Sequence, residues 1–419
     1  MEALRLRNFW PYFVGNLFSN CGTWLQNIAQ AILIYRLTGS TFLVGVANFA
    51  QFISAFVLTP WAGSAADRFD RRRLILVTQV CATAVSVLLT VLHVAGLASA
   101  PVVIGLVFLL GTTFAFSVPA IQAMIPDLVE REHLPSAMAM SSITFNGARA
   151  IGPVLGAAVV AQWGIGAAFA LNAVSYLGLV AGLLAVRPRQ AAGTGAPTVF
   201  RMRDSLRLVR DDTALLALLM VVAAISISQD PVSTLTPGFS SEVFDRADTM
   251  TGLLVGAFGA GSTLAAATAA SRAHDPVRLL APGCILMGVA MLGFALAPSL
   301  PFAFAALVLG GYFFMLTNTG ATTSLALEAA PEQRGRVMAM WSFCFVGTRP
   351  VASLADGALA SAVGLRAAGV ALTVPVVAAG VAMAVLRRRI ARLRQIGTGR
   401  SVPPVEPPAS ELPGIAPTQ

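Results

Sequence analysis

The chain has 419 residues, of which 56% are hydrophobic and only 11% are charged, and its mean hydropathy is +0.77. Soluble domains carry about 25% charged residues, so this composition excludes an ordinary soluble protein and indicates an integral membrane protein. The net charge of +9 comes from Arg residues that flank apolar segments, and it is therefore no argument for nucleic-acid binding.

Twelve apolar stretches are long enough to cross a bilayer as helices, since a spanning helix needs about 20 largely uncharged residues. They cover roughly residues 9–36, 41–62, 74–95, 101–123, 135–160, 165–186, 213–237, 250–271, 278–297, 301–325, 336–361 and 366–386. We therefore predict an all-α membrane protein with twelve transmembrane helices.

The first stretch carries an unusual number of polar side chains for a membrane helix. At 3.6 residues per turn, six of them fall on one face: Asn16, Ser19, Asn20, Thr23, Asn27 and Gln30. A polar stripe on a spanning helix must turn toward protein or water, so we expect this face to look into the bundle.

The Arg residues gather on one side of the predicted spans. If the N-terminus is cytoplasmic, 23 of the 28 basic residues lie on the cytoplasmic side, and the outer loops hold only Arg36, Arg246 and Arg366. The positive-inside rule therefore predicts that both termini are cytoplasmic.

The sequence also repeats itself at an offset of 200 residues. Residues 99–168 align with 299–368 without a gap, and AMAMSSITFNGAR (137–149) matches VMAMWSFCFVGTR (337–349), with a shared Gly and a shared Arg. The repeat contains six stretches, an even number, so both halves have the same orientation. Parallel six-helix repeats are the architecture of major facilitator transporters.

We accordingly predict four regions. Residues 1–186 and 213–386 form the two six-helix bundles. Residues 187–212 form a cytoplasmic linker whose second part has the composition of an interfacial helix. Residues 387–419 form a basic and then Pro-rich cytoplasmic tail, which is expected to be disordered.

The loop after the second stretch, GSAADRFDRRRL, resembles the major facilitator signature G-x-x-x-D-R-x-G-R-R. Five residues are in register with it: Gly63, Asp67, Arg68, Arg71 and Arg72. Asp70 stands where the family usually has Gly. The resemblance implies a gating role in which Asp67 docks near Gly335, at the start of the eleventh stretch. The alternative is a positive-inside anchor, which needs the Arg residues alone.

The fifth stretch contains ARAIGPVLGA (148–157), which resembles the antiporter signature G-x-x-x-G-P-x-x-G-G. Gly152, Pro153 and Gly156 match, whereas Ala148 and Ala157 replace glycines. The resemblance implies export and a role of these residues in gating. The alternative is a Pro kink with small residues for close helix packing.

Charged residues inside the spans are few. Arg149 and Arg349 each lie about 14 residues into a stretch, on the order of 20 Å deep, so each should face a cavity or pair with an acid. The acids are Asp230, which precedes Pro231 and a predicted kink, and Asp356. We take Asp230 as the best candidate for a proton-coupling carboxylate, held by Arg349 when deprotonated. Asp356 is its rival, and a purely structural ion pair is the alternative.

No enzyme constellation is evident in the sequence. The four Cys lie within predicted spans, the three His lie far apart, and no G-x-x-x-x-G-K-[S/T] phosphate loop occurs. We expect no catalytic activity, no cofactor and no metal site.

The opening GNLFSNCGTWLQNIAQAILIYRLTGS and the segment APEQRGRVMAMWSF resemble the bacterial subfamily of the enterobactin exporter and macrolide-efflux proteins. The resemblance implies a major facilitator fold in a bacterial cytoplasmic (inner) membrane, alternating access, and proton-coupled export of a small molecule such as a siderophore or an antibiotic. It also implies a central cavity, where substrate would bind to Asn16, Asn20, Thr23, Asn27, Gln30, Gln51, Asn146, Gln229 and Asn318.

The expected partners are the substrate, protons and the lipid bilayer, for a protein that acts as a monomer and binds no nucleic acid. Two other functions fit the same sequence. The fold could serve uptake or proton-independent facilitation, or it could act as a transporter-shaped receptor or scaffold that uses the Pro-rich tail.

Overall fold

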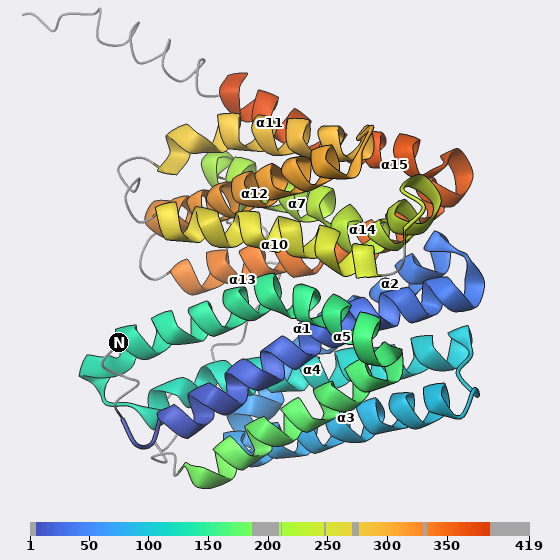
Figure 1. Ribbon diagram of the computed structural model, residues 1–419. Coiled ribbons are helices and arrows are strands. Elements are labelled where there is room, and N and C mark those ends of the chain that lie inside the picture. Colours follow the sequence, from blue (N-terminus) through green and yellow to red (C-terminus); the bar gives the residue numbers. More distant parts are fainter. Residues whose placement is uncertain are drawn as a thin grey trace, which may run out of the picture.

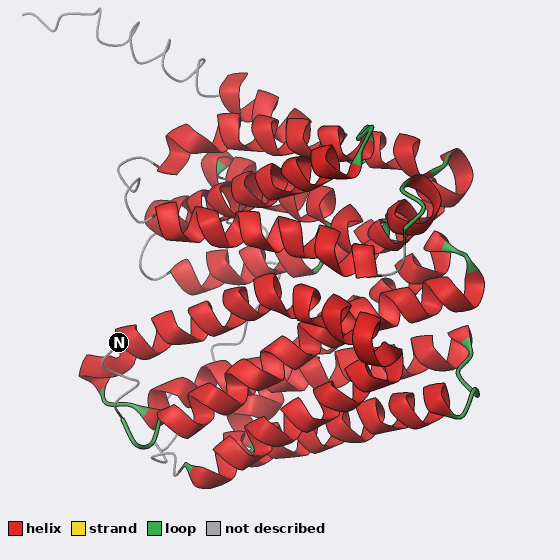
Figure 2. Ribbon diagram, in the orientation of Figure 1, coloured by secondary structure: helices red, strands yellow, loops and turns green. Residues whose placement is uncertain are grey.

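The computed structural model describes residues 6–186, 209–210, 212–246, 249–269, 276–329 and 333–385. The regular elements in these ranges are helices (Figures 1 and 2). Ten stretches among them are long and apolar enough to cross a membrane. The first helix, α1 (Trp10–Thr38), is not among the ten because its Asn and Gln side chains lower its hydropathy. The predicted all-α membrane class is confirmed.

The N half, residues 6–186, contains α1 and four further long helices: α2 (Thr41–Arg68), α3 (Arg71–Val94), α4 (Ala100–Leu128) and α5 (Leu134–Ala185). A short 3-10 turn, η2 (Arg131–His133), precedes α5. The backbone leaves the helical conformation inside α5 at Gly164, where φ is 82° and ψ is 174°. A positive φ of this kind favours glycine, and this break separates the predicted fifth and sixth spans.

The C half, residues 209–385, begins with a span that is broken into pieces. They are α7 (Thr213–Gln229), α8 (Pro231–Thr234), α9 (Thr236–Gly238) and the π-helical turn η3 (Phe239–Val243). The helices that follow are α10 (Thr249–Ala269), α11 (Pro276–Ala295), α12 (Leu300–Glu328), α13 (Arg334–Val346), α14 (Arg349–Val363) and α15 (Leu365–Ala371). Residues 374–385 are helical as well.

The repeat of 200 residues reappears in the backbone. Helix α4 covers residues 100–128 and α12 covers 300–328, so the two helices have the same length and the same offset. Gly364 breaks the chain between α14 and α15 with φ 85° and ψ 160°, as Gly164 does inside α5. The two halves therefore share helix boundaries as well as sequence.

Each half has its own apolar core. One buried cluster draws its residues from 209–383, and two others draw theirs from 9–186. The boundary in the predicted linker stays a prediction, because residues 187–208 and 211, like the predicted tail from 387 to 419, lie outside the described residues.

The two halves meet through small residues near one end of the bundle, where α2 lies beside α14 and α5 beside α10 (Figure 1). A Cβ on Gly357 would lie 2.9 Å from the Cα of Phe42, and one on Gly45 would collide with the backbone oxygen of Ser353. The hydroxyl of Tyr35 donates a hydrogen bond to Glu242 near the same end. This end, where α1 finishes and α2 begins, is hereafter the contact end.

Closure of the contact end is predicted to depend on the absence of a side chain at Gly45. Gly45→Ala should disfavour the closed arrangement by about 1–3 kcal/mol, because backbone cannot move aside as a flexible side chain can. The readout is labelling of Ser233→Cys by a membrane-impermeant maleimide added on the face of the contact end, after replacement of the four native cysteines.

Faster labelling than in the parent is expected. Gly105→Ala in α4 is the matched control, because a Cβ there meets open space. Equal labelling of the Gly45 and Gly105 variants would show that the contact does not hold this end closed.

Candidate functional site

A cavity of about 440 Å³ lies between the two halves, and both halves line it. Its aromatic lining consists of Trp24, Phe52, Phe258 and Phe314. Its polar lining consists of Asn27, Asn48, Gln51, Arg149, Gln229, Ser233, Ser262, Thr263 and Arg349. A mostly apolar pocket with a few polar groups, placed where two bundles meet, is the usual form of a small-molecule site.

The broken seventh span supplies one wall of this cavity. Helix α7 ends at Gln229, Asp230 lies at the junction, and α8 begins at Pro231. Because Pro231 has no backbone N–H, the regular ladder of helix hydrogen bonds is interrupted here. The N–H of Asp230 donates instead to the Ile227 carbonyl at 3.3 Å. The break predicted from Pro231 is therefore present in the structure.

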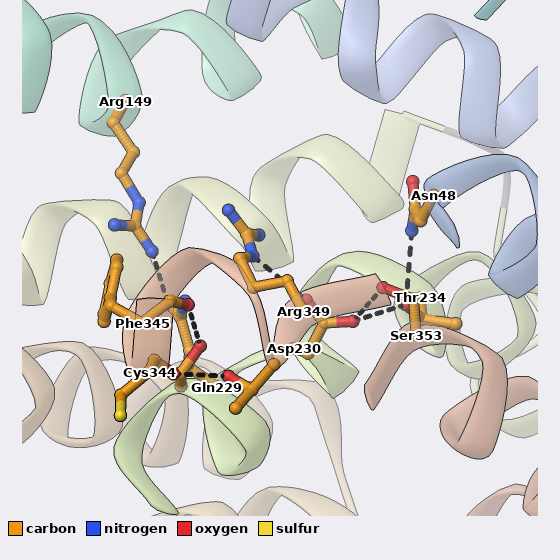
Figure 3. A network of polar contacts seen from close by, with 11 residues as sticks. Asn48, Arg149, Gln229, Asp230, Thr234, Cys344, Phe345, Arg349 and Ser353 are labelled. Carbon is orange, nitrogen blue, oxygen red and sulfur yellow. Dashed lines mark hydrogen bonds and ion pairs between the residues drawn. The ribbon is translucent and has the colours of Figure 1, made fainter. Parts of the chain in front are cut away.

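Asp230 and Arg349 form a buried ion pair, as the sequence predicts. The Arg349 Nε lies 3.3 Å from Asp230 Oδ1, and the two side chains are 9% and 1% exposed. The hydroxyls of Ser353 and Thr234 both donate to Asp230 Oδ2 (Figure 3). The amide of Asn48 then donates to Thr234 Oγ1 at 3.2 Å. Because Asn48 belongs to the N half, the carboxylate is linked to both halves.

Arg149 crosses the space between the halves. It extends from α5 and donates a hydrogen bond to Gln229 Oε1 of α7 (Figure 3). Its Cζ lies 5.6 Å from the ring centroid of Trp24 and 5.0 Å from that of Phe314. No ion pair joins it to an acid within the part of the chain that the structure describes. Arg349, its counterpart in the repeat, lies 4.1 Å over the ring of Phe52.

Asp356 is buried on α14, one turn beyond Ser353. It has no exposed surface, and neither carboxylate oxygen has a hydrogen-bond partner. Its burial shields it from water in this conformation. It lies close enough to Asp230 for the two carboxyls to repel each other when both are charged.

The C-terminal end of the polar stripe on α1 reaches the cavity. Asn27 lines it and accepts a hydrogen bond from Gln51 Nε2 at 3.1 Å. Gln30 is almost fully buried and donates to Gln51 Oε1 at 2.8 Å. These amides hold α1 and α2 together and fix the orientation of the two that face the cavity, Asn27 and Gln51.

The N-terminal end of the polar stripe does not face the cavity. Asn20 donates to the backbone and side-chain oxygens of Asn16, at 2.8 and 3.1 Å, and Thr23 donates to the hydroxyl of Tyr176 on α5. These three stripe residues and Asn318 of α12 do not line the cavity. The side chain of Asn146 lies outside the described part of the chain. A substrate-binding role for these residues stays a prediction.

Several polar residues of the site region were not singled out in the sequence, and two of them, Asn48 and Gln26, belong to the same helices as the predicted amides. Asn48 lines the cavity three residues before Gln51, on the same face of α2, and this spacing could have identified it. Gln26, 1% exposed, accepts hydrogen bonds from Ser86 and Asn172 inside the N half. No spacing rule distinguishes Gln26 from its neighbours on α1.

The residues of the loop signature lie at the end opposite the contact end. Arg71 forms an ion pair with Asp127 at 2.8 Å, and Arg72 donates to the carbonyls at the end of α5, both within the N half. Asp70 accepts a hydrogen bond from the Arg73 N–H at 2.7 Å and so caps α3.

Three signature positions have surroundings that do not test the gating role. A Cβ on Gly63 would meet open space, and Asp67 and Arg68 are exposed. The side chain of Arg334 and the surroundings of Gly335, where Asp67 is predicted to dock, are outside the described part. The gating role of the loop stays a prediction.

The second signature packs helices closely, as its alternative interpretation requires. A Cβ on Gly156 would lie 2.8 Å from the Leu25 carbonyl oxygen, and one on Gly152 would lie 3.0 Å from that of Cys21, so α5 approaches the backbone of α1. Pro153 lines the cavity and lies against α10 at Gly252. These contacts do not decide the direction of transport.

Comparison with known proteins places these features in a family context. The family model described as "Transmembrane secretion effector" matches residues 2–407. Macrolide efflux protein A of Streptococcus pyogenes is 22% identical over 85% of this chain and 90% of its own length. The enterobactin exporter EntS of Citrobacter koseri is 25% identical over 80% of each chain.

A shorter alignment covers 39% of this chain and 42% of the staphyloferrin A transporter of Staphylococcus aureus, at 25% identity. Among solved structures, an inward-facing, unoccupied bacterial homologue of the human lysosomal transporter Spinster matches with a TM-score of 0.76. It is 14% identical and covers 92% of this chain and 98% of its own, so the likeness concerns the fold.

The ion pair at the broken span is predicted to be costly to break from one side. Asp230→Ala leaves a buried guanidinium without its acid and should destabilise the protein by about 3–5 kcal/mol. Adding Arg349→Leu removes the uncompensated charge, so the double variant should recover part of the loss. Thermal unfolding of the purified protein measures both, with Ser353→Ala as the control that removes one hydrogen bond only. Additive losses would contradict direct coupling of the pair.

Proposed function

Since the chain belongs to the Transmembrane secretion effector family of major facilitator transporters, we propose that it exports a small molecule across a bacterial cytoplasmic membrane by alternating access. The protein is a transporter and not an enzyme. The observation that carries the proposal is the cavity at the junction of the two halves, because rocking of the halves would expose such a site to each side in turn.

The present conformation is proposed to be the inward-facing state. Among the described residues, the contacts between the halves gather between mid-bundle and the contact end, as far as the ring pair Phe56 and Phe343 with centroids 5.0 Å apart. The positive-inside rule assigns the contact end to the outer face, and it assigns the opposite end, with the exposed Asp67 and Arg68, to the cytoplasm. Substrate would then enter the cavity from the cytoplasm.

Proton coupling is proposed to act through Asp230. When Asp230 is charged, it holds Arg349 and accepts from Thr234, which Asn48 connects to the N half. Protonation would cancel the charge, weaken the ion pair and loosen that connection. Asp356, buried nearby without a partner, is a second group that can carry a proton through the cycle.

The proposal is tested first with a substrate found by comparing the media of cells that contain and lack the protein. In everted membrane vesicles, an imposed pH gradient should drive uptake of that compound by the parent protein. Asp230→Asn keeps the shape of the side chain but cannot ionise, so it should abolish gradient-driven uptake and spare downhill exchange. Full gradient-driven uptake by this variant would place the coupling elsewhere.

Asn27 is expected to contact substrate and Asn20 to serve as its internal comparison. Asn27→Leu removes a cavity amide and should weaken apparent affinity about three- to tenfold, the value of a typical hydrogen bond. Asn20→Leu changes a residue that does not line the cavity in this conformation, and a comparable loss of affinity there would support the predicted binding role of that end of the stripe. The same vesicle assay reports both, and an unchanged affinity in Asn27→Leu would remove Asn27 from the binding site.

A further inference from the structure

Arg149 brings a charge into the cavity that the protein does not neutralise. The charged residues that line the cavity are Arg149 and Arg349, and no Asp, Glu or Lys of the described residues joins them. The charge of Arg349 is paired, because Asp230, which does not itself line the cavity, forms an ion pair with it. Arg149 has the Gln229 oxygen and two ring faces instead. The cavity wall therefore carries one positive charge in excess.

The position of Arg149 leaves it free to bind. A guanidinium has five N–H donors, and the structure uses one of its nitrogens for Gln229. Its side chain is half-buried rather than enclosed, so a ligand in the cavity can reach it. A charge at this depth is unfavourable without a partner, and cation–π contacts with Trp24 and Phe314 replace only part of its hydration.

We propose that the transported compound is an amphipathic organic anion whose acid group binds Arg149 and whose apolar, aromatic body packs against Phe258 and Phe314. This proposal rests on the proposed function and specifies its substrate class. Arg149 is suited to the task because a planar guanidinium binds a carboxylate or a similar oxyanion through two parallel hydrogen bonds. The volume of about 440 Å³ is in the usual range for small-molecule pockets.

The same charges disfavour a cationic substrate. A cation would meet two guanidinium groups that already repel each other, in a site where low polarity strengthens the repulsion. The acid closest to the cavity wall, Asp230, is engaged by Arg349, Ser353 and Thr234. A neutral substrate would leave the excess charge uncompensated.

Equilibrium dialysis against the full-length protein in nanodiscs tests the proposal, with empty nanodiscs to correct for partition into lipid. The probes are 2-naphthoate, 2-naphthamide and 2-naphthylmethylammonium, which share one aromatic body and differ in charge. We expect the naphthoate to bind at least about tenfold more tightly than the amide, and the ammonium to bind least.

Arg149→Gln should remove the preference for the anion, so that the naphthoate and the amide bind with similar affinity. Arg149→Lys should retain part of the preference. Arg73→Gln, which removes an exposed Arg outside the cavity, should retain all of it. Equal binding of the three probes, absence of naphthoate binding, or an anion preference that survives in Arg149→Gln would overturn the proposal.

Flux of the same probes out of proteoliposomes separates this inference from the proposed function. Flux of the amide or the ammonium in preference to the naphthoate would keep the transporter and overturn the anion preference. Arg149-dependent binding of the naphthoate without flux would keep the anion site and count against export.

Discussion

A polar break in the middle of a membrane span, at Asp230 and Pro231, organises the centre of this protein. Inside a bilayer every polar group must find its partner within the protein, and an unpaired charge there is costly. The Asp230 carboxylate at the break binds Arg349 and two hydroxyls, and one of those hydroxyls accepts a hydrogen bond from Asn48 of the opposite half. A local requirement for partners thus becomes a connection between the two six-helix units.

The rest of the architecture gives that connection room to change. At the contact end the halves approach through glycines, such as Gly45 and Gly357, so their contact depends on close fit and can be made or lost as a whole. The polar centre and the cavity lie between this end and the exposed loop signature. In the proposed cycle, protonation at the polar centre therefore shifts the equilibrium between the arrangements of the two ends.

Much of this was predictable because charged residues are scarce in the spans. With few acids available, pairing of Arg349 with Asp230 follows from depth, and the break follows from Pro231. Helical periodicity was less informative for α1, since it groups residues on a face but does not say which neighbour each turn meets. Along one stripe, Thr23 meets Tyr176 of α5, whereas four residues later Asn27 meets Gln51 and the cavity. The burial of Asp356 likewise depends on packing between the halves, which no local pattern encodes.

The proposed cycle requires the two ends to move in opposite senses when the centre is protonated. Spin labels at Leu37 and Val363 report the contact end, and labels at Phe69 and Leu327 report the opposite end; all four positions are exposed. Distances from pulsed electron resonance in nanodiscs should show, on acidification, the first pair separating as the second pair approaches, with no change in an Asp230→Asn background. Distances that stay fixed, or two pairs that open together, would contradict a proton-driven exchange between inward- and outward-facing states.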